Sequence, residues 1–211
     1  AVLCLAESAD GIHWEKPSVE IFTFQGSKNN NIVYAEDDEG HLPPHGAHVA
    51  IDPSAPEQER YKMLHCARDK EGMFVAGAVS PDGIHWAAIR EPIVRWASDV
   101  QTVAVWDEQH KHYKGYFRGW GDDNVPYGRR RVDHAVTDDW RRWPRPTPCL
   151  ITDANDHPGT DIYTNAFTPW PGAQDAYLMF PVFYPHASDA METHLAVSTD
   201  GRIWQRPLRE R

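Results

Sequence analysis

Short hydrophobic runs alternate along this chain with polar turn sequences. The runs are rich in β-branched and aromatic residues, and glycine, proline, aspartate or asparagine bounds most of them. No stretch shows the 3.6-residue period of an amphipathic helix. The pattern is typical of β-strands joined by tight turns, so it predicts an all-β fold. The clearest runs lie at residues 31–35, 48–52, 61–67, 73–79, 102–107, 113–117, 177–183 and 193–198.

A seven-residue motif that ends in tryptophan recurs in the sequence. Residues 8–14, 80–86 and 198–204 share the pattern Ser-x-Asp-Gly-x-x-Trp, and residues 137–143 follow it with threonine first and tryptophan in place of glycine. The hydroxyl and the carboxylate can bind backbone N–H groups of a turn, and glycine permits a positive φ. We expect buried, structural tryptophans at Trp14, Trp86, Trp143 and Trp204. We also expect a strained or different turn in the copy that lacks glycine.

The spacing of the motif predicts a repeated unit of four strands. Successive copies begin 72, 57 and 61 residues apart. Four-stranded units of ~50–60 residues are typical of β-propeller blades. We therefore expect about three and a half blades: the end of an earlier blade plus an insert at 1–43, then blades at 44–97, 98–158 and 159–211. A propeller needs at least four blades to close, so we expect missing blades or another copy of the chain to complete it.

Composition narrows the class of partner. The chain has 31 acidic and 21 basic residues and a net charge of -10, which argues against nucleic acid as a partner. A basic cluster between Arg129 and Arg145 is interleaved with aspartates, and we interpret it as a solvated face. No apolar run approaches the ~20 residues of a membrane span. The three cysteines lack metal-site spacing and no nucleotide-binding motif occurs, so we predict no metal and no cofactor, although a cation in a central channel is compatible with the fold.

The recurring motif resembles the Asp box of sialidases and related propellers. The wider sequence resembles five-bladed β-propeller glycoside hydrolases of families 32, 43 and 68, and is most similar to bacterial proteins labelled family-32-like. Residues 7–17, 26–33, 98–107, 113–120 and 161–181 carry this resemblance. It implies a five-bladed parent propeller that hydrolyses glycosidic bonds of a poly- or oligosaccharide. It also implies that one channel aspartate stabilises the transition state while a glutamate of another blade acts as the acid.

The sequence departs from that family in its signatures. The WMNDPNG-like opening and the RDP and EC motifs of family 32 are absent, and residues 68–70 resemble RDP only in part and follow a predicted second strand. Two other functions stay open. A noncatalytic carbohydrate-binding propeller would lack paired carboxylates in its channel. A sialidase would need three converging arginines and a Tyr–Glu pair, and Arg68 and Arg118 supply two candidates.

Polar residues stand at the start of each predicted first strand. First strands line the central channel of a propeller, so side chains at their starts converge from several blades. The residues that we expect to contact a saccharide there are His45, His48, Gln101, Tyr163 and Asn165. The structural alternative is that these side chains satisfy hydrogen bonds within the fold.

Cleavage of a glycosidic bond requires two carboxyl groups. Asp99 and Asp161, both at first-strand starts, form the best pair, and Glu192 is the further candidate acid. The alternative for the aspartates is turn capping, and for Glu192 a solvated edge.

Three further residues complete the predicted site. Arg118, near the end of a second strand, can clamp a carboxylate or a pair of hydroxyl groups. Trp120 and Trp170 lie outside the motifs and can stack on sugar rings. Structural packing is the alternative for all three.

Overall fold

The computed structural model describes residues 1–121 and 130–208 and consists almost entirely of β-strands. Sixteen strands and one 3-10 turn, Glu57–Glu59, make up the regular structure of these residues. The all-β prediction is therefore confirmed. Within the described ranges, no helix has the length and apolar character that crossing a bilayer requires.

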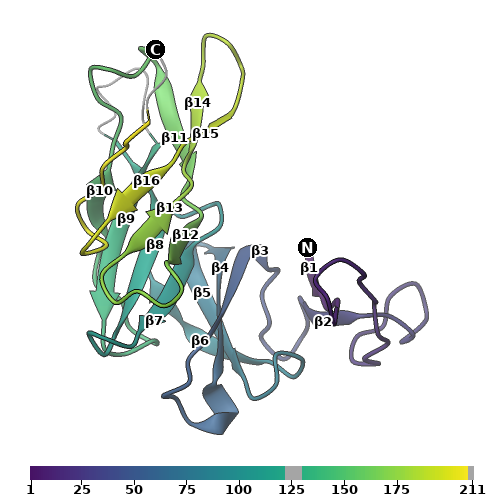
Figure 1. The fold of residues 1–211 in the computed structure, drawn as a ribbon. Helices are drawn as coiled ribbons and strands as arrows, with labels where there is room; N and C mark the ends of the chain where they lie inside the picture. The colour runs from purple at the N-terminus through teal and green to yellow at the C-terminus, as the bar shows by residue number, and fades with distance from the viewer. Residues whose placement is uncertain (122–129, 209–211) are drawn as a thin grey trace.

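Two four-stranded antiparallel meanders form the centre of the structure (Figure 1). The first consists of β3 (His45–Ile51), β4 (Tyr61–Asp69), β5 (Gly72–Ser80) and β6 (Ala87–Val94). The second consists of β7 (Val103–Asp107), β8 (His112–Trp120), β9 (Arg130–Thr137) and β10 (Thr147–Leu150). Each strand pairs with the next in sequence, which is the organisation of a propeller blade. A two-stranded sheet of β1 (Val2–Cys4) and β2 (Ile32–Ala35) precedes them.

The last part of the chain forms three long strands, each interrupted at the same level. The resulting sheets are β11–β14–β15 and β12–β13–β16. Ala166 has a φ of 42° at the break, and Pro181 has no N–H for the ladder. A bridge between Val197 and Gln205 stands where a fourth strand would lie. The strands are β11 (Thr160–Thr164), β12 (Phe167–Pro169), β13 (Tyr177–Met179), β14 (Val182–Pro185), β15 (Glu192–Thr193) and β16 (Ala196–Ser198).

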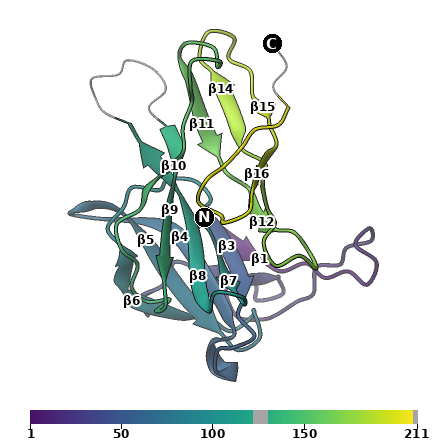
Figure 2. The same ribbon diagram turned by 60° about the vertical axis from the view of Figure 1, so that its left-hand side comes forward.

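Strand β8 is buried on both faces because its alternate side chains pack against different sheets. Tyr113 and Phe117 join the core between the two meanders, with residues such as Leu64 and Val75. Tyr116, on the other face, joins Ile162, Phe167 and Tyr177 of the last sheets. Figure 2 shows the two meanders packed side by side. The sheets of the described residues do not close into a ring, as expected for a partial propeller.

The three motifs that contain glycine form the same turn. The φ angles of Gly11, Gly83 and Gly201 are 74°, 78° and 73°. In each copy the serine hydroxyl accepts a hydrogen bond from the glycine N–H at 2.8–2.9 Å. The aspartate carboxylate accepts from the next two backbone N–H groups at 2.7–2.8 Å. In the fourth copy, Trp140 lies outside the positive-φ region and Thr137 donates to the carbonyl of Arg142, so this turn is of another type, as predicted.

The tryptophans that end the four motifs differ in burial. Trp143 is 7% exposed and packs in the core between the meanders, whereas Trp86 and Trp204 are partly buried against neighbouring cores. Trp14 is 62% exposed, so the expectation of a buried side chain is wrong for that copy. Trp14 joins none of the buried clusters of the described residues, because its turn belongs to the two-stranded end of the structure.

This difference predicts unequal effects of the same substitution. Trp143→Ala should lower the free energy of unfolding by about 3–5 kcal/mol, because it leaves a cavity between two sheets. Trp14→Ala is the matched control and should change it by about 0.5 kcal/mol. Urea denaturation followed by tryptophan fluorescence and circular dichroism measures both. Equal losses would contradict the packing described here.

Candidate functional site

The starts of β3, β7, β9 and β11 meet the end of β8 at one end of the sheets. Within a meander this follows from antiparallel pairing, which places the start of one strand beside the end of the next. Between the meanders, the Nε2 atom of His45 lies 2.9 Å from the carbonyl oxygen of Asp99. A Cβ added to Gly46, whose φ is 60°, would lie 2.7 Å from the carbonyl carbon of Val100. The first strands of the two meanders therefore touch at their starts.

Arg118 joins two of the predicted site segments. Its side chain is 2% exposed and its Nη1 lies 2.6 Å from Oδ1 of Asp99. Its Nη2 donates to the carbonyl oxygen of Tyr163 at 2.6 Å. A guanidinium so deeply buried requires such partners. The side chain of Asp99 is 34% exposed. Arg118 therefore contacts the carboxylate on its buried side, while the other side faces solvent.

Asp161 is a buried carboxylate with three donors. The backbone N–H of Arg130 donates to it at 3.1 Å, the Arg130 guanidinium forms an ion pair with it at 2.5 Å, and Nε2 of His186 lies 3.0 Å away. Burial alone would raise the pKa of Asp161, but the hydrogen bonds from His186 and Arg130 outweigh burial and lower it. Asp161 is therefore ionised at neutral pH and has no proton to give.

Two aromatic rings lie between these ion pairs. The ring of Tyr163 lies 4.3 Å from the guanidinium carbon of Arg118 and 5.3 Å from that of Arg130. The ring of Trp120 lies 5.8 and 5.7 Å from the same two atoms, and its N–H donates to the carbonyl of Ala97 at 2.6 Å. We call the group Asp99, Arg118, Trp120, Arg130, Asp161, Tyr163 and His186 the channel-end cluster.

The strand that carries Asp161 has a different neighbour from the one that a regular propeller would give it. Its strand, β11, packs beside β9, which is the third strand of the second meander, and Arg130 is the first residue of β9. The two predicted aspartates thus lie at one end of the sheets. They are linked through Arg118, Tyr163 and Arg130.

Other predicted contact residues have partners within the fold. Asn165 is 2% exposed and accepts a hydrogen bond from the N–H of Phe167. The Nδ1 atom of His48 lies 3.5 Å from the backbone nitrogen of Ala104, and burial lowers the pKa of His48 to about 4. Gln101 is exposed beside the start of β3. These positions match the structural alternative for Asn165 and His48, and they leave Gln101 and His45 at the edge of the cluster.

The structure does not bring Glu192 or Trp170 to the channel-end cluster. Glu192 pairs with Phe183, which pairs with Ile162. Because paired residues share a face of a sheet, Glu192 lies on the face opposite Asp161. Its carboxylate lies 3.3 Å from Nε2 of His194. Trp170 is in the β12–β13 turn, which lines a cavity with the end of β7, away from Asp99.

Arg130 and His186 are the members of the cluster that the sequence did not identify. Interpretation of the basic cluster as a solvated face is wrong for Arg130, which pairs with buried Asp161, and for Arg131, which pairs with buried Asp133 at 2.7 Å. The strand period of two was the available signal, since it places Arg130 on the same face as buried Val132. No local pattern marks His186, whose partner lies 25 residues earlier.

One group of described residues has metal-ligand geometry. Ligand atoms of Asp107, His110 and His112 lie within 4.8 Å of one another. The Asp107 carboxylate, however, already pairs with the Lys114 ammonium at 2.7 Å and accepts from Tyr177. The lysine charge opposes a cation there, so these residues do not suit a metal ion.

Comparison with known proteins identifies the fold. No family model and no curated protein matches the chain. Solved structures do match: β-1,2-mannobiose phosphorylase from Listeria innocua has a TM-score of 0.66 at 13% identity, with 97% of this chain and 52% of that chain covered. An N-acetylgalactosamine deacetylase from F. plautii gives 0.61 at 16%, with 95% and 59% covered. A fructofuranosidase from Schwanniomyces occidentalis gives 0.58 at 12%, with 96% and 38% covered.

These likenesses confirm the β-propeller class. The structural neighbours are enzymes that act on carbohydrates, and they include a glycosidase and a phosphorylase. The chain spans 38–59% of the length of the three structures named.

The charge state of Asp161 predicts a pH-dependent contribution to stability. Asp161→Asn should lower the free energy of unfolding by about 3–5 kcal/mol at pH 7, because it leaves Arg130 without its buried partner. Because the folded-state pKa lies below the unfolded value of ~3.9, the contribution is complete above about pH 4 and is lost as the pH falls further. Urea titrations at pH 7, 5 and 3 test this, with exposed Asp38→Asn as control. A difference that persists unchanged to pH 3 would contradict it.

Proposed function

We propose that the channel-end cluster cleaves glycosidic bonds of a poly- or oligosaccharide, within a five-bladed parent propeller. The observation that carries the proposal is Asp99, a partly exposed carboxylate held by buried Arg118 beside the rings of Trp120 and Tyr163. A fixed negative charge beside aromatic surface suits a sugar ring whose transition state is oxocarbenium-like. The carbohydrate-active neighbours of the fold support the same substrate class.

Asp99 and Asp161 have different roles in this proposal. Asp99 faces the substrate and acts as base, nucleophile or stabiliser of developing positive charge. Asp161 is a positioning residue, because it is buried and orients Arg130 and His186.

The leaving oxygen needs a separate proton donor, since Asp161 is ionised. We assign this role to His186. Its side chain is 36% exposed, and its Nε2 atom lies 3.0 Å from the carboxylate of Asp161. His186 is preferred to Glu192, which the strand register places on the opposite face of its sheet.

Carbohydrate binding without cleavage is the second candidate function. Arg118 and Arg130 each neutralise one of the two aspartates, and the aromatic rings between them suit binding alone. A measurement of saccharide turnover therefore distinguishes the two functions.

Asp99→Asn tests the proposed function directly. Turnover should fall roughly 10²–10⁴-fold because the charge is lost, while the affinity for the saccharide should stay within a few-fold of the original. A panel of neutral oligosaccharides, assayed with and without inorganic phosphate, measures turnover and identifies water or phosphate as acceptor. Calorimetry measures binding, and exposed Asp38→Asn is the control. Binding with no turnover on any saccharide would support the second candidate, and unchanged turnover in Asp99→Asn would overturn the proposal.

A further inference from the structure

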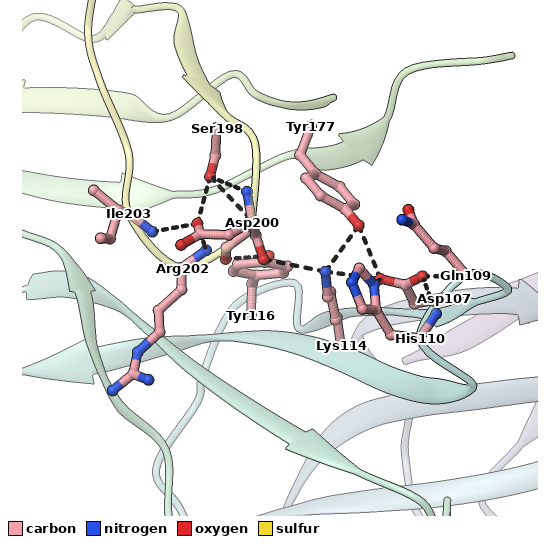
Figure 3. Close-up of polar contacts among 11 residues, drawn as sticks. Asp107, Gln109, His110, Lys114, Tyr116, Tyr177, Ser198, Asp200, Arg202 and Ile203 are labelled. Atoms are coloured by element: carbon pink, nitrogen blue, oxygen red, sulfur yellow. Dashed lines mark hydrogen bonds and ion pairs between the residues drawn. The ribbon is translucent and has the colours of Figure 1, made fainter. Parts of the chain in front are cut away.

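A cavity lined by histidines and charged side chains lies away from the channel-end cluster. It has a volume of about 490 Å³ and lies between strands β8 and β9 and the turn at residues 198–204. Figure 3 shows this turn facing Lys114 and His110. We call it the interface cavity, and the lining residues that matter here are His112, His134, Pro144, Asp175, Asp200 and Arg202.

Three of the charged groups beside this cavity are engaged within the fold. Asp107 and Lys114 form an ion pair at 2.7 Å, and Tyr177 donates to the same carboxylate at 2.9 Å. The guanidinium carbon of Arg145 lies 5.3 Å from the ring centre of Trp96, which packs against the core between the two meanders. The first two charges therefore neutralise each other, and the third is directed toward that core.

The charges that remain are two carboxylates and one guanidinium. The side chains of Asp175 and Arg202 form no hydrogen bond with a residue that the structure describes. Oδ1 of Asp200 accepts from the hydroxyl of Ser198 and from two backbone N–H groups of its own turn (Figure 3), which leaves Oδ2 as an acceptor. The cavity therefore has no surplus of positive charge for an anion. It presents hydrogen-bond acceptors beside a hydrogen-bond donor.

Two histidines of the cavity have unused nitrogens. The Nε2 atoms of His112 and His134 are buried and have no hydrogen-bond partner among the described residues. His134 is 9% exposed; burial, with the charges of Lys114 and Arg202, lowers its pKa to about 4. Its imidazole is therefore neutral at pH 7, and Nε2 donates or accepts according to the tautomer. A buried polar atom without a partner is costly. A hydroxyl group both donates and accepts, so it satisfies this nitrogen in either tautomer.

We propose that the interface cavity is a second saccharide-binding site, which holds an uncharged sugar ring by its hydroxyl groups. The carboxylates of Asp175 and Asp200 accept hydrogen bonds from hydroxyl groups, and the guanidinium of Arg202 donates to them. His134 bonds to a further hydroxyl, and Pro144 offers an apolar surface to the C–H groups of the ring. A neutral sugar matches both the donors and the acceptors, and it carries no charge that the two carboxylates would repel. The volume is in the range of small-molecule sites.

An NMR titration at pH 7 tests the proposal, with the imidazole signals of His134 as the reporter of binding at this cavity. These signals are assigned by their loss in His134→Gln. The separate probes are galactose, glucose, mannose, galacturonic acid and glycerol. We expect a saturable shift of the His134 signals with at least one of the three neutral hexoses in the millimolar range. Glycerol, which has no ring, should give no saturable shift, and galacturonic acid should bind no more tightly than galactose.

A pair of aspartate variants gives the matched comparison. Asp175→Ala should weaken hexose binding about tenfold, because a charged acceptor is lost. Asp138→Ala is the control, since Asp138 is exposed directly after β9 but does not line the cavity. Both positions are exposed, and circular dichroism and thermal melts establish that the variants remain folded.

Each result has a defined meaning. A hexose-dependent shift of His134 that weakens in Asp175→Ala and persists in Asp138→Ala supports the proposal. No shift with any hexose, an equal response to glycerol, tighter binding of galacturonic acid than of galactose, or equal weakening in Asp138→Ala would overturn it. Asp99→Asn should give the same His134 shifts as the unmodified protein, so this test is independent of the glycan-cleaving function.

Discussion

The buried guanidinium of Arg118 is the interaction on which the candidate site depends. It binds the carboxylate of Asp99, in the segment that leads into β7, and the backbone carbonyl of Tyr163 in β11. These segments belong to different sheets, and Arg118 belongs to the strand between them. A charge that is 2% exposed is stable only when its partners are fixed. The hydrogen bond to Tyr163 ties the second meander to the last sheets, and the ion pair with Asp99 fixes the guanidinium that makes it.

The alternation of side chains along β8 explains why the guanidinium of Arg118 faces the last sheets. Tyr113 and Phe117 face the first meander, while Lys114, Tyr116 and Arg118 face the last sheets. Tyr116 fills the apolar middle of that second face. Lys114 and Arg118 stand toward its two ends, where each meets an aspartate. One alternating strand thus positions the channel-end cluster at one end of this face and the Lys114–Asp107 ion pair at the other.

Much of this arrangement was predictable from local patterns. Alternation and turn residues predicted the strands, and the repeated motif predicted equivalent turns around Gly11, Gly83 and Gly201. Asp99 and Asp161 were found because both lie at the starts of predicted first strands. Arg130 and His186 were not, because their contact with Asp161 arises from packing between segments 31 and 25 residues apart. The face on which Glu192 lies depends on strand register, and the exposure of Trp14 depends on what packs beside its sheet; neither is encoded locally.

The central claim is that Asp99 and Asp161 flank one site through Arg118, Tyr163 and Arg130. A crystal structure with an oligosaccharide bound measures this most directly. The account predicts sugar density against the Asp99 carboxylate and the ring of Trp120 or Tyr163, with Asp161 behind Arg130 and both ion pairs intact. Density elsewhere on the molecule, with the two carboxylates on opposite faces of the sheets, would contradict it.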